Sequence, residues 1–195
     1  MITEGANLER VGALSDGIFA VIITIMVLEL RPPAGHDVSA LLELWPNATS
    51  YAISYLFIAV VWLNHHHVFR YARRLTGVLA WSNFANLFAI SLIPFTTAWM
   101  ASSRVAAFPV TLYAAVFLLV ELTYIVLMSE TLRQGVESAE DLRSHRIHFR
   151  RAWIMVAVFA LAALAYPVPP AYRLGVMATF LIFHIRPDLL RQPRA

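Results

Sequence analysis

Residues 11–30 read VGALSDGIFAVIITIMVLEL, and this stretch decides the fold class. A helix crosses the hydrocarbon core of a bilayer with about 20 mostly apolar residues, and this stretch has that length with only Asp16 and Glu29 charged. Pro32 and Pro33 follow it, and proline ends a helix because it lacks the backbone N–H and its ring clashes with the preceding turn. We therefore expect a first transmembrane helix over residues 11–30.

The composition of the whole chain agrees with a membrane protein. Hydrophobic residues make up 59% of the 195 residues and charged residues only 14%, whereas a soluble domain is about half apolar and a quarter charged. The chain has no cysteine, which excludes disulfides, thiolate metal sites and cysteine nucleophiles. Its net charge of +3 comes from arginines that lie between apolar stretches. Lipid headgroups and membrane topology explain that placement better than a nucleic-acid partner, and we expect none.

Five further apolar stretches predict a bundle of six transmembrane helices, all-α and without a soluble domain. The third contains Pro94, where we expect a kink or an end, and the last two are short enough that a re-entrant hairpin is an alternative. The N-terminus carries Glu4 and Glu9 and no basic region, so we expect no cleaved signal peptide. The five stretches cover residues 48–69, 79–100, 108–128, 152–166 and 172–185.

The arginines predict the orientation of these helices, because cytoplasmic segments of multi-span proteins carry the excess of basic residues. With the N-terminus inside, 12 of the 15 basic residues fall in cytoplasmic segments, and only Arg31, Arg104 and Arg173 fall outside. We therefore expect a multi-pass protein of the plasma (inner) membrane with both termini cytoplasmic. The polar stretch over residues 130–151 is predicted to be a cytoplasmic amphipathic helix or linker.

Asp16 is a charge inside the first predicted helix. Such a charge is costly in a bilayer and calls for a partner. The sequence offers Arg10 at the cytoplasmic entrance and the adjacent hydroxyl of Ser15. We therefore expect Asp16 to belong to a polar network.

The same helix carries an apolar stripe with one threonine. At about 100° per residue, Val21, Thr24, Ile25 and Leu28 share one face, and Asp16 lies about 140° away from Val21. A face of this kind can line a pore while Asp16 packs into the bundle. From the residues alone, ordinary packing of an apolar stripe explains the face better than a pore.

Three blocks of the sequence resemble the transmembrane protein 175 potassium-channel family. The run from Arg10 to Asp16 is similar to the family signature of arginine, three residues and phenylalanine-serine-aspartate, with Leu14 in place of the phenylalanine. Residues 62–69 read WLNHHHVF, similar to the family's tryptophan-x-x-histidine block. Residues 83–97 hold two asparagines followed by LIPFTT, similar to its asparagine and proline-phenylalanine-x-threonine block. Bacterial members are single six-helix repeats that assemble as tetramers, so the resemblance implies a homotetramer.

The resemblance implies a pore at the tetramer axis, lined by the first helix of each subunit. By position, Val21 is the hydrophobic constriction, Thr24 a hydroxyl layer, and Ile25 and Leu28 the continuing apolar lining. The sequence lacks the threonine-valine-glycine-tyrosine-glycine filter of other potassium channels. We therefore predict a potassium-preferring cation channel that conducts passively and has no cofactor besides its permeant potassium ions. Glu29, near the outer end, is predicted to concentrate cations at the pore mouth.

In this picture Asp16 has a structural role. Buried polar groups in a membrane must find partners within the protein, and several neighbouring helices offer them. The predicted structural network consists of Arg10, Ser15, Asp16, Trp62, His65, His66 and Asn86.

Three other functions compete with a channel. A proton-coupled secondary transporter is the closest, because the last two stretches are short and transporters favour broken helices, although we find no internal repeat. A metal site is disfavoured, because His65, His66 and His67 point about 100° apart on a helix and cannot converge on one ion. An enzyme is disfavoured, because no nucleophile, phosphate or metal motif is present.

Overall fold

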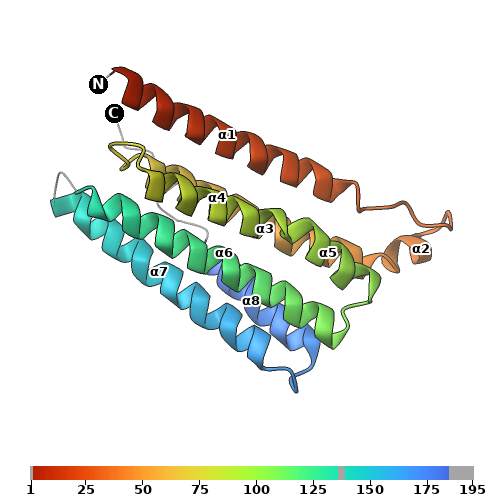
Figure 1. Ribbon diagram of the computed structural model, residues 1–195. Helices are drawn as coiled ribbons and strands as arrows, with labels where there is room; N and C mark the ends of the chain where they lie inside the picture. The colour runs from red at the N-terminus through yellow and green to blue at the C-terminus, as the bar shows by residue number, and fades with distance from the viewer. Residues whose placement is uncertain (1, 136–138, 185–195) are drawn as a thin grey trace, which may run out of the picture.

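The computed structural model describes residues 2–135 and 139–184, and within them the chain forms eight helices and no strand. The helices run roughly parallel or antiparallel to one another in an elongated bundle (Figure 1). Helix α6 packs most extensively against α7 and α4, whereas α1 lies at one side of the bundle. The helices are α1 (Ile2–Val27), α2 (Val38–Leu42), α3 (Trp45–Phe69), α4 (Gly77–Ser91), α5 (Ile93–Ser102), α6 (Ala107–Arg133), α7 (Ala139–Leu164) and α8 (Pro170–His184).

Five segments of the described chain are long and apolar enough to cross a membrane. They are Asn7–Val27, Trp45–Phe69, Gly77–Ser102, Ala107–Arg133 and Asp141–Leu164. Helix α8, at the place of the predicted sixth span, has 15 residues, and at about 1.5 Å per residue it is shorter than the hydrocarbon core. The end of the predicted span at residue 185 lies outside the described residues, so a sixth crossing stays a prediction.

The third apolar segment is divided at Pro94. Helix α4 ends at Ser91, Leu92 caps it, and α5 begins at Ile93 with Pro94 in its first turn. Proline cannot donate to the carbonyl of Ile90, four residues earlier, but it fits a first helical turn, where that N–H has no partner in any case. The predicted interruption at Pro94 is therefore a break between two helices.

Helix α7 begins well before the predicted fifth span at residue 152. It includes Arg143, Arg146 and Arg150, which are exposed, whereas His145 and His148 between them are buried. Exposed and buried residues that recur every three to four positions are typical of an amphipathic helix. The polar stretch is thus continuous with the span from residue 139 onward, and the linker alternative does not hold there.

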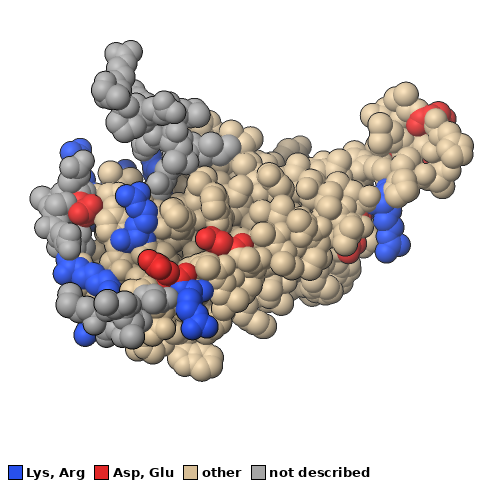
Figure 2. Space-filling view, turned by 90° about the horizontal axis from the view of Figure 1, so that it is seen from above, with Lys and Arg blue, Asp and Glu red and all other residues tan. Residues whose placement is uncertain are grey.

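The charges gather at one end of the bundle. On the face seen in Figure 2, arginines gather at the end where the chain begins and where α6 turns back into α7 (Figure 1). The opposite end, next to α2, carries few of them, and the flank between the ends is largely uncharged. This asymmetry in space agrees with the arginine distribution along the sequence.

Arg173 joins α8 to the bundle. Its side chain is 2% exposed, and its guanidinium donates to Thr111 Oγ1 at 2.7 Å, to the Ala107 carbonyl at 2.9 Å and to the Ala162 carbonyl at 3.3 Å. These acceptors lie on α6 and α7. One side chain therefore holds three helices together.

We expect Arg173→Met to destabilise the protein by about 2–4 kcal/mol, because charge-assisted bonds are lost and buried acceptors are left unpaired. Thermal unfolding in detergent measures the effect. Arg146→Met, which removes an exposed arginine of α7, is the control. Equal midpoints for the two variants would contradict the role of Arg173.

Candidate pore helix and its polar anchor

Helix α1 packs one face against the bundle and leaves the other uncovered. Phe19 is 1% exposed, and Ile22 and Met26 are also buried, on the side toward α3, α4 and α5. On the other side Val21 is 54% and Leu28 76% exposed. An apolar face of this size inside a membrane segment must be covered by lipid or by another subunit.

The residues predicted to line a pore all lie on this uncovered face. Val21, Thr24, Ile25 and Leu28 are exposed, with Leu28 just beyond the last helical residue, Val27. The Thr24 hydroxyl donates within its own helix, to the carbonyls of Val21 at 2.9 Å and Ala20 at 3.1 Å. Its oxygen therefore remains an acceptor, which is the group that a cation requires.

An open, mostly apolar groove of about 1050 Å³ runs between α1 and the α4–α5 segment. Val21 and Ile25 line it from α1, and Phe84, Phe88 and Phe95 line it from α4 and α5. The uncovered face of α1 therefore borders a surface that also lacks a partner within the subunit.

Asp16 joins α1 to α3 on the side of α1 that faces away from Val21. The Trp62 indole N–H donates to Asp16 Oδ1 at 2.8 Å. Both side chains are partly exposed in the isolated subunit. A hydrogen bond to a carboxylate is among the stronger ones in proteins, so this pair fixes the rotation of α1 and hence the direction of its uncovered face.

A second, buried chain of hydrogen bonds lies beside this pair. Asn83 Nδ2 donates to Ser15 Oγ at 3.1 Å, and Asn83 Oδ1 lies 2.7 Å from His65 Nε2. Ser15 Oγ also donates to the Val11 carbonyl at 2.8 Å. Ser15, His65 and Asn83 are all 2% exposed or less. The network therefore connects α1, α3 and α4 at one level.

The remaining members of the predicted network lie elsewhere. Arg10 is exposed, and no hydrogen bond or ion pair joins it to Asp16 within residues 2–135 and 139–184. His66 is exposed, and its ring lies 6.1 Å from that of Trp62. Asn86 donates to the Val120 carbonyl and to Thr123 Oγ1, both at 3.0 Å, and so ties α4 to α6. Trp62, rather than Arg10, is the partner of Asp16.

Asn83 was not among the predicted network residues. It comes three residues before Asn86 within an apolar stretch, and an amide inside a membrane span is a signal of interhelical hydrogen bonding. The two side chains point to different neighbours, α1 and α3 for Asn83 and α6 for Asn86. The sequence signal was therefore present but did not reveal which asparagine joins Ser15 and His65.

Glu29 lies beyond the end of α1, at the rim of an open pocket of about 740 Å³. Arg31, Phe95 and Trp99 also line this pocket. The carboxylate is exposed, and α1 ends on the side of the bundle where α2 lies (Figure 1).

The histidine triplet divides among three surroundings. His65 is buried in the Asn83 network, His66 is exposed, and the His67 ring lies 4.1 Å from that of His148 on α7. In the described part of the chain, no three histidine, aspartate or glutamate side chains lie close enough together to hold a metal ion.

The chain resembles a set of known channels in sequence and in structure. The family profile described as "Endosomal/lysosomal potassium channel TMEM175" matches residues 10–94. A potassium channel of Chryseobacterium sp. (strain P1-3) is 30% identical over 92% of this chain and 93% of its own length. The chain belongs to the TMEM175 family. A potassium channel of Streptomyces collinus is 31% identical, covering 82% of this chain and 79% of the relative.

A solved structure supports the same assignment for the fold. The crystal structure of a lysosomal potassium-selective channel TMEM175 homolog from Chamaesiphon minutus superposes with a TM-score of 0.81 at 26% identity, covering 92% of this chain and 96% of that one. The family resemblance and the all-helical membrane fold expected from the sequence are therefore confirmed. The TMEM175 family is a family of ion channels rather than enzymes.

Proposed function

We propose that four copies of this chain form a potassium-preferring cation channel whose pore is lined by the uncovered face of α1. The observation that carries the proposal is the exposure of Val21, Thr24, Ile25 and Leu28 on a membrane helix whose other face is buried. One helix cannot enclose a pore, so closed symmetry around an axis is required. The names of the relatives support potassium conduction, and the groove beside α1 leaves room for a neighbouring subunit.

The chemistry of the proposed pore follows from these side chains. Val21 from four subunits forms an apolar constriction that opposes a hydrated ion and closes by dewetting. Thr24, one turn toward the outer end, presents hydroxyl oxygens that replace part of the water shed by the ion. Potassium sheds water more readily than sodium, which gives the preference. Glu29 raises the local cation concentration at the mouth of the pore.

The protein lies in the plasma membrane, with the arginine-rich end and the N-terminus on the cytoplasmic side.

The absence of cysteine from the sequence allows a direct test of the axis. We expect Val21→Cys to form disulfide-linked dimers under mild oxidation, because copies of residue 21 meet across the axis. Val27→Cys is the matched control, since Val27 is exposed on the same helix about 120° away from Val21. Non-reducing electrophoresis measures the product. Equal cross-linking at both positions would contradict the assignment of the pore face.

The size of Val21 predicts a selectivity effect. Valine is smaller than leucine, so a ring of four leucines narrows the constriction and raises the dehydration that an ion must undergo. We expect Val21→Leu to lower the sodium-to-potassium permeability ratio below that of the wild type, as measured from reversal potentials. A wild-type ratio no higher than that of Val21→Leu would contradict Val21 as the constriction.

A further inference from the structure

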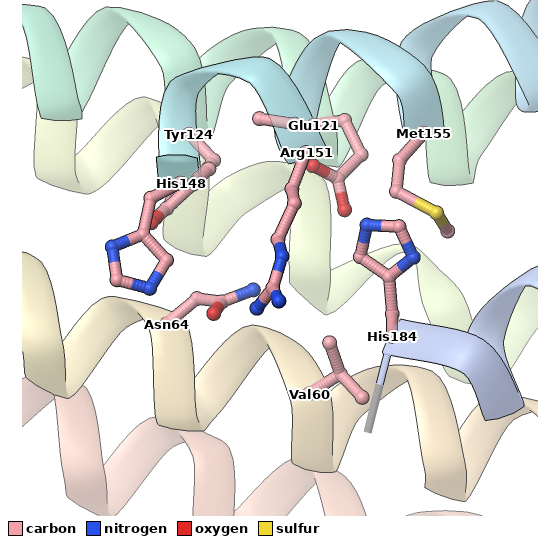
Figure 3. Close-up of a pocket in the computed structure, with 9 residues that line it drawn as sticks. Val60, Asn64, Glu121, Tyr124, His148, Arg151, Met155 and His184 are labelled. Atoms are coloured by element: carbon pink, nitrogen blue, oxygen red, sulfur yellow. The ribbon is translucent and has the colours of Figure 1, made fainter. Parts of the chain in front are cut away.

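A second polar cluster lies within the bundle, away from α1. Glu121 of α6, His148 and Arg151 of α7, and His184 of α8 line a cavity of about 20 Å³ next to α3. This volume is room for about one water molecule. Figure 3 shows the Glu121 carboxylate and the Arg151 side chain pointing into the space between the helices, with the His184 ring beside the carboxylate.

Glu121 is an unusual residue for its place. It is 4% exposed, lies near the middle of the apolar α6 segment, and makes no hydrogen bond or ion pair with any of residues 2–135 or 139–184. An ionised carboxylate at such depth is strongly unfavourable without a partner, and residues of this kind mark functional sites in membrane proteins. Within the same described residues, His184 Nε2 is also buried without a hydrogen-bond partner.

The groups around Glu121 are mostly basic or neutral. Arg151 is the one permanent cation among the cavity residues, and His148 and His184 are the ionisable bases beside it. Tyr124 is the other titratable group from α6, and α3 contributes uncharged Val60 and Asn64. Helices α4 and α5, which also pack on α6, place no residue in the lining. The charge of Glu121 therefore decides whether the cavity is balanced or has a net positive charge.

We propose that this cluster binds one exchangeable proton on Glu121, through a single water in the cavity, and that proton uptake loosens α8 from α6 and α7. With Glu121 ionised, the carboxylate attracts Arg151 and both histidines, and His184 carries α8 with it. When Glu121 takes up a proton, one negative charge is removed and the remaining basic groups repel one another. Helix α8 is held at its other end by Arg173, so the loosening is confined to the segment near His184.

The proton itself can be observed without recording current, which keeps this proposal separable from the channel proposal. Infrared difference spectra of the purified protein in bilayers report the carbonyl stretch of a protonated carboxyl group. The spectra are compared between about pH 9 and about pH 5, because buried carboxyl groups titrate within this range. We expect a band in the wild type and in Glu130→Gln that is absent from Glu121→Gln. Glu130 is the matched control, because it is on the same helix but pairs with Arg133.

Two results would overturn the proposal. They are persistence of the same band in Glu121→Gln, and absence of any pH-dependent carboxyl band in the wild type. If Glu121→Gln does not assemble, Arg151→Gln decides. Loss of the cation should move the appearance of the band to higher pH, and an unchanged midpoint would contradict an electrostatic influence of Arg151 on Glu121. Deuterium exchange over residues 170–184 tests the consequence for α8, and we expect faster exchange at the lower pH in the wild type but not in Glu121→Gln.

Discussion

Replacing Val21 by asparagine is expected to raise the potassium current per tetramer by about tenfold or more. The amide side chain keeps water in the constriction, so an ion no longer meets an apolar ring and the pore loses its dewetted closed state. A tenfold increase corresponds to about 1.4 kcal/mol removed from the barrier. Single-channel and macroscopic currents in planar bilayers measure the effect, with protein amount determined from the same vesicles.

Val27→Asn is the matched control for this change. It introduces the same side chain on the same helix at an exposed position about 120° from Val21. We expect its current to remain within about twofold of the wild type, since the substitution lies away from the proposed axis. Equal increases in both variants would place the constriction elsewhere.

Replacing Asp16 by leucine is expected to abolish most tetramers and most current. The substitution removes the acceptor of the Trp62 indole, a bond of 2.8 Å, and a hydrogen bond to a charged group contributes about 1.5–3 kcal/mol. Without it, α1 loses the contact that sets its rotation on α3. Size-exclusion chromatography of the detergent-solubilised protein and current density measure the two losses.

Asp16→Asn separates geometry from charge, because its amide oxygen still accepts from Trp62. We expect most of the assembly to survive in this variant. Any current left in either variant should keep the wild-type ion selectivity, since Asp16 lies about 140° from Val21. A wild-type tetramer yield in Asp16→Leu, or a changed selectivity with full assembly, would contradict an anchoring role.

Combining Asp16→Leu with Trp62→Phe tests whether the two side chains act as a pair. The double variant should lose little more tetramer than either single variant.

Much of the fold could be predicted from length and apolar content. The stretches near residues 11–30, 48–69 and 108–128 each overlap one long helix of the structure, because about 20 apolar residues have few stable alternatives in a bilayer. The interruption at Pro94 could also be predicted, since it follows from the missing N–H. The start of α7 could not be predicted in the same way. The first turns of this helix are rich in arginine, and by composition alone they resemble a polar loop, whereas their helical spacing indicates an amphipathic helix.

The site was predictable only in part, for a related reason. Helical periodicity groups Val21, Thr24, Ile25 and Leu28 on one face without any tertiary information. The partner of Asp16 depends on how α1 and α3 pack, so the nearest residue along the chain, Arg10, was a poor guide to it. The Glu121 cluster had one signal, a single carboxylate within the predicted span over residues 108–128. Its basic neighbours come from α7 and α8 and are brought together only by the fold.

The reversal potential of the purified protein in a planar bilayer, with potassium on one side and sodium on the other, tests the central claim most directly. We predict an ohmic current whose reversal potential is shifted toward the potassium equilibrium, with a smaller shift in Thr24→Val, which removes the hydroxyl and keeps the side-chain shape. A current that saturates and follows an imposed proton gradient would instead indicate a coupled transporter. A potassium-shifted current that is the same in the wild type, Thr24→Val and Val21→Leu would contradict a pore lined by α1.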